Sequence, residues 1–275
     1  MKKLTIFVFI FLLIGACDAF AKDYILSLGK LPLYIKSPDK GILIKVIKAM
    51  DREYKGGHFI IKVYPLRRSI ENVINGEADF HFPTIGSKIW GKETGKHEEE
   101  LRRKGLFRST ASLTETHFAL FSNKGKPPIN EKHLERYKIE TDAGHTFFFG
   151  PYVRGTTCLS CSIKKLSAGR IDGLIFAARE IDHIIKKLHI TNVRRQNFRI
   201  FGSKFILPVG KKGEKLDRLL QGLIYKMIKD GTLRKAAGQY SSYFIREFGS
   251  DYLPKLSDIP KSYLTKYKND AANTK

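Results

Sequence analysis

A pattern that occurs twice constrains the fold of this chain more than any other feature. In each copy the end of a helix is followed by a glycine, an aspartate and a short apolar run. The clearer copy spans residues 166–177 and reads LSAGRIDGLIFA, and an earlier copy, VINGEADFHF, spans residues 73–82. Glycine ends the helix and the apolar run is typical of a buried strand. Two copies predict two similar α/β lobes, with a site between them at the carboxyl ends of their strands.

The first residues have the pattern of an export signal. Two lysines precede an apolar run at residues 4–16, and Ala19-Phe20-Ala21 then forms an A-x-A cleavage site. The run is too short to anchor the chain as a membrane span. We therefore predict that residues 1–21 are a signal peptide, cleaved after Ala21, and that the mature protein lies in the periplasm. An alternative is lipoprotein processing at Cys17, because residues 14–17 resemble a lipobox.

The chain is long enough for one large or two small domains and is strongly basic. It has 275 residues, 42% of them hydrophobic, and a formal net charge of +23. Removal of Lys2, Lys3 and Asp18 with the signal peptide lowers that charge to +22. No interleaving of aromatic and basic residues or binding motif suggests a nucleic-acid partner, and export argues against one. A basic surface is the simplest interpretation, and a weak attraction to an anionic membrane surface or ligand stays open.

After cleavage the cysteines that remain are Cys158 and Cys161. In an oxidising compartment this C-x2-C pair can form a small disulfide loop, and two free thiols are the alternative. Zinc would need two further ligands that no nearby spacing supplies, so we predict no metal site. Nothing that resembles a thioredoxin unit surrounds the pair, so a catalytic redox role is not expected.

The first third of the chain alternates strands and helices. Strands are expected near residues 24–28, 58–64 and 79–82, with helices near residues 40–55 and 65–74 between them. The order β-α-β-α-β predicts a parallel sheet with right-handed crossovers. A long polar insertion follows at residues 83–109 and contains the lone Trp90. Loops of that length are usually functional or mobile.

The remaining elements predict a second lobe and a return to the first. A strand at residues 117–122 leaves the first lobe, and residues 137–141 form the next strand. Residues 198–201 and 205–209 are expected to be two strands separated by Gly202-Ser203, where the chain returns. An apolar stripe at residues 216–228 predicts a long helix, and the tail from about residue 250 is polar.

A strand and a probable helix are joined by a glycine turn in the second lobe. The strand at residues 137–141 runs into Gly144, His145 and Thr146. Backbone N–H groups at such a helix start can bind an anion, for example the carboxylate of a ligand. The turn is a weak signal by itself, because many strand–glycine–helix turns bind nothing.

The order and spacing of these elements resemble the type II periplasmic solute-binding proteins, in particular the extracellular solute-binding protein family 3 of amino-acid ABC importers. The residues that carry the resemblance are 75–79, 166–173, 205–210 and 216–233. It implies an α/β fold of two lobes, each a mainly parallel sheet flanked by helices, with hinge crossings near residues 111–116 and 201–204.

The resemblance also implies domain boundaries and partners. Lobe 1 would comprise residues 22–114 and 203–275, and lobe 2 residues 115–202. A ligand would bind in the cleft of a monomer without a cofactor, and closure of the lobes would present the ligand to an inner-membrane ABC permease.

The binding residues of the family match this chain in part. Thr84 stands where a ligand-binding threonine is expected, but no arginine follows it, so Lys88 or Arg67 of the Arg67-Arg68 pair would supply the cation. In the second lobe Gly144, His145 and Thr146 match the helix start that binds the carboxylate of the ligand.

The acid that holds the ligand ammonium in the family is missing. Its expected position falls at Phe176-Ala177, which are apolar, and Glu180 and Asp182 follow on the next helix. A standard α-amino acid is therefore in doubt, and an acidic or neutral solute with aromatic contacts is favoured. The predicted ligand-binding residues are Thr84, Lys88, Arg67, Trp90, Gly144, His145, Thr146 and Phe176, and Phe80, Phe82 and Phe147 are further aromatic candidates.

Three functions follow from these observations. The leading one is a periplasmic solute-binding protein that captures a small polar solute, amino-acid-like or an organic acid, for an ABC importer. The second is an enzyme of the dehydratase or cyclase type on the same fold, against which the chain shows no Cys-His or Ser-His-Asp set and no pair of cleft carboxylates. The third is a sensor module that presents a ligand to a membrane receptor.

Overall fold

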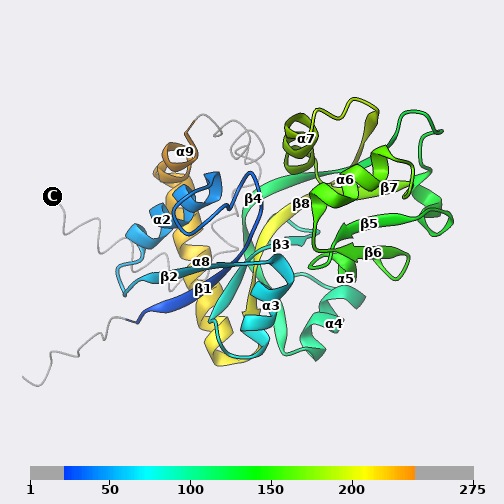
Figure 1. The fold of residues 1–275 in the computed structure, drawn as a ribbon. Coiled ribbons are helices and arrows are strands. Elements are labelled where there is room, and N and C mark those ends of the chain that lie inside the picture. Colours follow the sequence, from blue (N-terminus) through cyan, green and yellow to red (C-terminus); the bar gives the residue numbers. More distant parts are fainter. Residues whose placement is uncertain (1–21, 239–275) are drawn as a thin grey trace, which may run out of the picture.

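The computed structural model describes residues 22–238 as a mixed α/β structure built on one sheet (Figure 1). The predicted signal peptide, its cleavage site and the C-terminal tail lie outside the described residues. The eight strands have the order β2-β1-β3-β8-β4-β7-β5-β6. In chain order they are β1 (Tyr24–Gly29), β2 (Phe59–Tyr64), β3 (Phe80–Gly86), β4 (Leu106–Asn123), β5 (Ile139–Asp142), β6 (Val153–Thr156), β7 (Gly173–Ala177) and β8 (Val193–Pro208).

Helices lie beside the strands toward each end of this sheet. The described helices are α2 (Ile42–Glu53), α3 (Leu66–Ile74), α4 (Lys96–Arg103), α5 (Thr146–Phe149), α6 (Leu159–Ser167), α7 (Ala178–Lys187), α8 (Lys211–Lys229) and α9 (Thr232–Ala237), with a short 3-10 segment, η1, at Glu131–Arg136. No helix in the described part is long and apolar enough to cross a membrane.

The first half of the structure consists of β1, β2 and β3 with helices α2, α3, α8 and α9. Strand β1 pairs in parallel with β2 on one side and β3 on the other, which confirms the predicted β-α-β-α-β order. Helix α2 buries one apolar face, since Leu43, Val46, Ile47 and Met50 are almost completely shielded from solvent. This spacing is the reason the segment forms an amphipathic helix on the sheet.

The second half consists of β5, β6 and β7 with helices α5, α6 and α7. Strand β5 pairs in parallel with β6 and with β7. The clearer copy of the repeated pattern forms the end of α6 and all of β7, in which every residue is buried. Strand β6 was not predicted, because its four residues, VRGT, carry no apolar alternation.

Two long antiparallel strands, β4 and β8, run through both halves (Figure 1). Strand β4 pairs with β7 at residues 118–122, and β8 pairs with β3 at residues 202–206. The predicted hinge segments, 111–116 and 201–204, lie within these strands, and their pairing shifts register between Arg108 and Ser112 and between Ser112 and Thr114. The lobe boundaries themselves stay a prediction.

The sequence interpretation of two segments was wrong. Strand β8 continues through Gly202-Ser203, where a break was predicted, because β4 pairs with it on both sides of that point. The polar segment 83–109 is not one long loop, since it contains the end of β3, helix α4 and the start of β4. Glu98 on α4 is buried, with Arg108 Nη1 2.8 Å from its Oε2.

Candidate functional site

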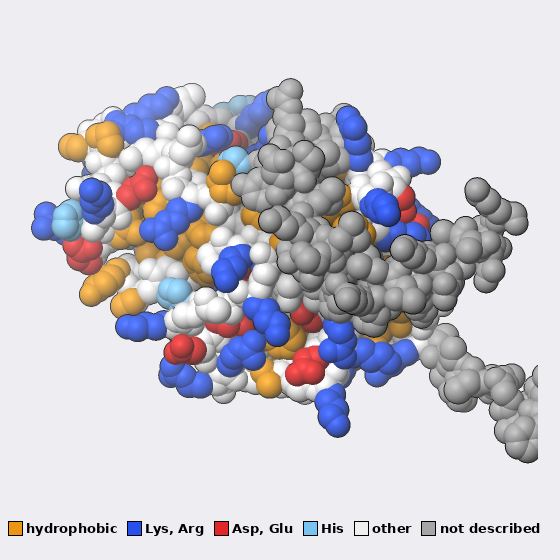
Figure 2. All heavy atoms as spheres, turned by 180° about the vertical axis from the view of Figure 1, so that it is seen from behind, with side chains coloured by type: hydrophobic (Ala, Val, Ile, Leu, Met, Phe, Trp, Pro, Cys, Tyr) orange, Lys and Arg blue, Asp and Glu red, His pale blue; other side chains and the backbone are white. Residues whose placement is uncertain are grey.

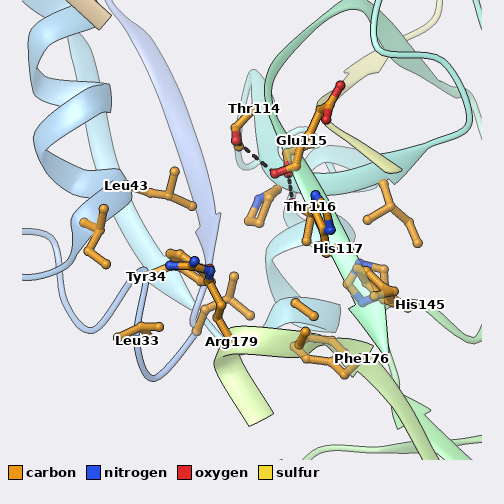
Figure 3. Close-up of a pocket in the computed structure, with 18 of the residues that line it drawn as sticks. Leu33, Tyr34, Leu43, Thr114, Glu115, Thr116, His117, His145, Phe176 and Arg179 are labelled. Atoms are coloured by element: carbon orange, nitrogen blue, oxygen red, sulfur yellow. Dashed lines mark hydrogen bonds between the residues drawn. The ribbon is translucent and has the colours of Figure 1, made fainter. Parts of the chain in front are cut away.

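A cavity of about 430 Å³ lies between the two halves and is bordered by the long strands (Figure 3). This volume lies within the range of small-molecule sites. The first half contributes Leu31, Leu33, Tyr34, Ile42, Leu43, Pro83, Thr84 and Ile85; β4 and β8 contribute Thr114, Glu115, Thr116, His117, Phe118, Arg195 and Ser203; and the second half contributes His145, Phe176, Ala177, Ala178, Arg179 and Asp182.

Local strand and helix ends place these side chains. The cavity is bordered by the loop that follows β1, by the end of β3 and by the end of β7. Each of these segments lies at the carboxyl end of a strand. Ligands bind at this edge in open α/β sheets, because the connecting loops there lie above the sheet and are free to vary. The prediction of a site at the strand ends of both halves therefore agrees with the location of the cavity.

Aromatic and aliphatic side chains form most of the described wall. The rings of Phe118 and Phe176 are 5.6 Å apart, and the His145 ring packs edge-on to both, at 5.8 and 5.4 Å between centroids. Leu31 and Leu43 face them from the first half. Such a wall gives favourable contacts to an apolar group of a ligand.

Two buried polar side chains in the wall lack a hydrogen-bond partner within the described structure. Thr84, on β3, is 1% exposed and its Oγ1 has no partner; His145, before α5, is 4% exposed and its Nδ1 has none. Burial, helped by the nearby His81 and Arg108, lowers the pKa of His145 to about 3. His145 is therefore neutral at physiological pH, and both groups can hydrogen-bond an uncharged polar group.

The charged side chains of the described lining lie on the long strands and on α7. Arg195 Nη1 donates to Asp182 Oδ2 at 2.6 Å, which makes an ion pair between β8 and α7. In Figure 3 the guanidinium of Arg179 lies beside Tyr34, while the side chain of Glu115 points away from Phe176. Phe176 and Ala177, where the resemblance places an acid, are both buried in the apolar wall.

The structure brings three of the predicted ligand-binding residues, Thr84, His145 and Phe176, together in the wall of this cavity. They come from β3, the turn before α5, and β7, so the sequence pattern located strand ends in both halves. The other predicted residues are not among its lining residues.

The predicted cations and Trp90 make contacts elsewhere. Lys88 donates to the backbone carbonyl of Lys92 at 3.0 Å, and Arg67 pairs with Glu71 one helical turn along α3 at 3.0 Å. Trp90 forms an isolated bridge with Ala111 and packs on the core. These side chains are held by local partners, whereas the cavity is lined by the strand ends.

The predicted anion site at the start of α5 is already filled by a side chain of the protein. The Gly144 N–H donates to Asp142 Oδ1 at 2.8 Å, and Thr146 Oγ1 donates to the carbonyl of Ala143 at 3.2 Å. Burial raises the pKa of Asp142 to about 6. The turn thus has the residues expected of a site for a ligand carboxylate, but these residues make hydrogen bonds to other groups of the same loop.

The aromatic candidates Phe80 and Phe82 lie in the core of the first half, where Phe82 packs 4.7 Å from Phe205. Phe147 instead contacts the guanidinium of Arg108, 5.3 Å from its ring centroid. Cys158 and Cys161 are joined by a disulfide bond at the start of α6. Among the described residues no group of three or more His, Cys, Asp or Glu is placed to hold a metal ion.

Sequence reasoning missed the wall formed by the loop after β1 and by β4. Leu31, Leu33 and Tyr34 are ordinary loop and core residues by type. Residues 114–116 lay in a predicted crossing and residues 117–118 began a predicted strand, and neither segment carries a chemical motif. The available signal was topological: the loop at residues 31–34 follows the first strand, so it lies at the carboxyl edge of the parallel sheet.

Side-chain contacts join the two halves next to the cavity. Glu180, in the first turn of α7, is fully buried, and its Oε1 accepts the Leu33 N–H at 2.8 Å. Burial raises the pKa of this carboxyl to about 7. Away from α7, the His97 ring on α4 stacks 5.5 Å from Phe148 of α5 (Figure 1). Side-chain contacts within the protein thus join the two halves beside the cavity.

Comparison with known proteins shows the fold through solved structures. No family model matches the chain, and no curated protein matches it in sequence. A histidine kinase sensor domain with similarity to periplasmic binding proteins has 15% sequence identity and a TM-score of 0.64, over 80% of this chain and 96% of that one. An ancestral arginine-binding protein bound to arginine has 17% identity and a TM-score of 0.60, over 82% and 99%.

The substrate-binding protein of an amino acid ABC transporter is also similar, at 15% identity and a TM-score of 0.58, over 82% of this chain and 100% of that one. The similarity extends over most of both chains in each comparison. The chain therefore has the type II periplasmic binding protein fold, as its strand and helix order predicted.

Proposed function

We propose that this protein is a periplasmic solute-binding protein that captures a small solute between its two halves and delivers it to an ABC importer. The observation that carries the proposal is the cavity of about 430 Å³, which is lined from both halves and from the two strands that connect them. A ligand in that position contacts both halves at once, so it stabilises the closed arrangement over an open one.

The architecture supports a closing motion. The register shifts in the β4–β8 pairing lie where the predicted hinges are, and strand irregularities let two parts of a sheet rotate relative to each other. The contacts of Glu180 with Leu33 and of His97 with Phe148 would break on opening. Closure would then convert ligand occupancy into a shape that a permease can recognise.

A binding role fits the chemistry of the cavity better than catalysis does. The solved structures compared above are binding proteins and a sensor domain. His145, the central titratable group in the wall, is flanked by the rings of Phe118 and Phe176 rather than by a nucleophile or carboxylate among the described residues. A general base or acid needs a partner and a pKa near the working pH.

The proposal is tested by a ligand screen on the purified protein. The protein is exported from a bacterial host, unfolded in guanidinium to release bound molecules and refolded, and its melting temperature is measured with amino acids, organic acids, small peptides, amines and neutral amides. We expect at least one compound to raise the melting temperature and to be recovered unchanged, because ligands that bind the folded state stabilise it. A compound consumed during incubation would instead establish an enzyme.

A sensor module is the second candidate. The similarity to a histidine kinase sensor domain, at a TM-score of 0.64, supports it. The two roles are separated in a strain that lacks the gene, once a ligand is known. Loss of uptake of the radiolabelled ligand supports the importer role, whereas normal uptake with an altered transcriptional response to the ligand supports the sensor.

A further inference from the structure

The charges that line the cavity are used within the protein. Arg195 and Asp182 form an ion pair of 2.6 Å with each other. Arg179 and Glu115 each take part in an interaction within the described structure. With two arginines and two carboxylates in the described lining, the formal charges also cancel. Each charged side chain in this set therefore already has an interaction within the protein.

The buried polar groups of the described lining that lack a hydrogen-bond partner are uncharged. Thr84 Oγ1 and His145 Nδ1 come from opposite halves and both residues line the cavity. Each side chain is more than nine-tenths buried, so an unmade hydrogen bond there destabilises the protein without ligand. A bound molecule that hydrogen-bonds one or both groups would remove this penalty. Such a pair matches a hydroxyl, a carbonyl or a carboxamide.

The surrounding wall is unsuited to an unpaired charge. Phe118, Phe176 and Ala177 are at most 6% exposed, and Leu31 and Leu43 close the opposite side. A carboxylate or ammonium group placed against these five side chains loses its hydration and finds no counter-ion among them. An apolar body gains contacts there instead.

We propose that the ligand of this cavity is an uncharged molecule with an apolar body and one hydrogen-bonding group, such as a small amide or alcohol, rather than an amino acid or an organic acid. The group meets Thr84 and His145, and the body packs on the rings of Phe118 and Phe176. This inference rests on the proposed function, because it names the ligand class of the same site.

Matched compounds test the charge of the ligand directly. Two series share a branched aliphatic or an aromatic body: 4-methylpentanamide, 4-methylpentanoate, 4-methylpentylamine and L-leucine; and 3-phenylpropanamide, 3-phenylpropanoate, 3-phenylpropylamine and L-phenylalanine. Melting temperatures are measured on the refolded protein at equal millimolar concentrations. We expect the amide of at least one series to give the largest rise, with the charged partners giving little or none.

The outcomes separate this inference from the proposed function. A rise as large with an acid, an amine or an amino acid overturns the inference and leaves the solute-binding function standing. No rise with any of the eight compounds also overturns it, because a cavity of this kind should accept one of the two bodies. Failure of the whole ligand screen described above, in contrast, counts against the proposed function itself.

A variant pair tests the role of Thr84. Thr84→Val keeps the shape of the side chain but removes a hydroxyl that has no partner, so we expect the melting temperature without ligand to stay the same or rise. The affinity for the amide should fall by up to about tenfold, the equivalent of one hydrogen bond. Unchanged amide affinity in this variant would remove Thr84 from the site.

Thr141→Val is the matched control. Thr141 is also fully buried, but its hydroxyl donates to the backbone carbonyl of Ile175 at 2.8 Å and it does not line the cavity. This variant should therefore lower the melting temperature without ligand and keep the affinity for the amide. We thus expect the melting temperature without ligand to stay the same or rise in Thr84→Val and to fall in Thr141→Val. This difference distinguishes a hydroxyl that binds a ligand from a hydroxyl that stabilises the fold.

Discussion

Lys204 is a buried charge that joins several segments of the described structure. It lies on β8 and is shielded completely from solvent. Its Nζ donates to the carbonyls of Ser109 and Thr110, at 2.9 and 2.8 Å, and to the carbonyl of Gly91 at 3.1 Å. Glu93 Oε1 lies 3.7 Å from it. Burial lowers the pKa of Lys204 to about 8, so it keeps its charge at pH 7.

Lys204→Met should strongly destabilise the protein. The substitution leaves three backbone carbonyls without their shared donor and the Glu93 carboxylate without its nearby cation. Removal of one partner of a buried ion pair lowers the free energy of unfolding by about 3–5 kcal/mol. Chemical denaturation measures the change. Lys212→Met is the control, because Lys212 pairs with Asp79 at the surface, and loss of that pair should change the free energy of unfolding by about 1 kcal/mol or less. Equal effects of the two variants would contradict the role given to Lys204.

Residue types explain where sequence reasoning about the site succeeded and where it failed. His145 follows a strand at a glycine turn, so it could be predicted from local pattern, whereas Thr84, near the end of β3, was predicted from the resemblance to the binding-protein family. Lys88 and Arg67 were chosen because a cation was expected, but surface cations find neighbours such as the Lys92 carbonyl and Glu71. Which of several nearby charges faces a cavity depends on packing between segments far apart in the chain, which a single sequence does not display.

At the scale of elements, the loop after β1 is held against α7 by one carboxyl group. Glu180 has no exposed surface, its Oε1 accepts the Leu33 N–H, and its Oε2 has no partner within the described structure. Leu33 and the neighbours of Glu180 on α7, Ala178, Arg179 and Asp182, all line the cavity. The protonation state of Glu180 therefore bears on how firmly the two halves stay together.

Glu180→Gln should change the pH dependence of stability. Burial raises the pKa of Glu180 from the ordinary glutamate value to about 7, against the attraction of Lys36 and the backbone N–H groups of Leu33 and Tyr34. The folded state binds the proton of Glu180 more tightly than the unfolded state does. The stability that this bound proton contributes is therefore complete below the unfolded pKa of about 4.3 and is lost as pH rises through 7. Gln keeps the acceptor oxygen and cannot titrate, so this part of the decline should disappear.

Melting temperatures of the two proteins between pH 4 and 8 measure the effect. We expect the variant to be more stable relative to the natural protein at pH 8 than at pH 4. Glu180→Ala serves as a control, because it removes the contact with Leu33 as well as the titration and should lower stability at both pH values. Parallel curves for the natural protein and Glu180→Gln would show that the carboxyl group titrates normally.

Elements with a strong local pattern were predicted well, and elements that depend on pairing were not. Helices α2 and α8 carry apolar stripes, and the two helix–glycine–strand copies became α3–β3 and α6–β7. Strand β6 and the continuity of β8 through Gly202 arise from hydrogen bonds to β5 and β4, respectively. From the sequence alone, a glycine suggests that a strand ends there. Gly202 instead lies inside β8 and is required there, because a Cβ at this position would lie 2.2 Å from Ser112 Oγ.

At the scale of the whole molecule, the positive charge is large and dispersed. The chain has 50 Lys and Arg against 27 Asp and Glu. On the face shown in Figure 2, lysine and arginine side chains are scattered among other surface residues, with acidic side chains between them. Ion pairs such as Lys48–Asp39 and Lys126–Asp172 therefore use only part of the basic side chains. Mutual repulsion of the remaining positive charges opposes the compact state.

Salt should therefore stabilise this protein. At low ionic strength the Debye length is about 30 Å, so positive charges repel across the whole molecule, and at physiological ionic strength it falls to about 8 Å. Screening weakens this long-range repulsion more than it weakens ion pairs in direct contact. We expect the melting temperature to rise by several degrees between 10 mM and 150 mM sodium chloride.

A variant with less charge tests the cause. Lys62, Lys132 and Lys215 are exposed and lie on β2, η1 and α8, so their joint substitution by Gln removes three positive charges from separate regions. If repulsion limits stability, this triple variant should melt higher than the natural protein at 10 mM salt and gain less from added salt. A melting temperature that falls with salt in both proteins would instead mean that surface ion pairs outweigh repulsion. In that case the basic side chains would stabilise the fold by pairing with acidic side chains. Their dispersal over the surface would place a basic neighbour beside each acidic side chain.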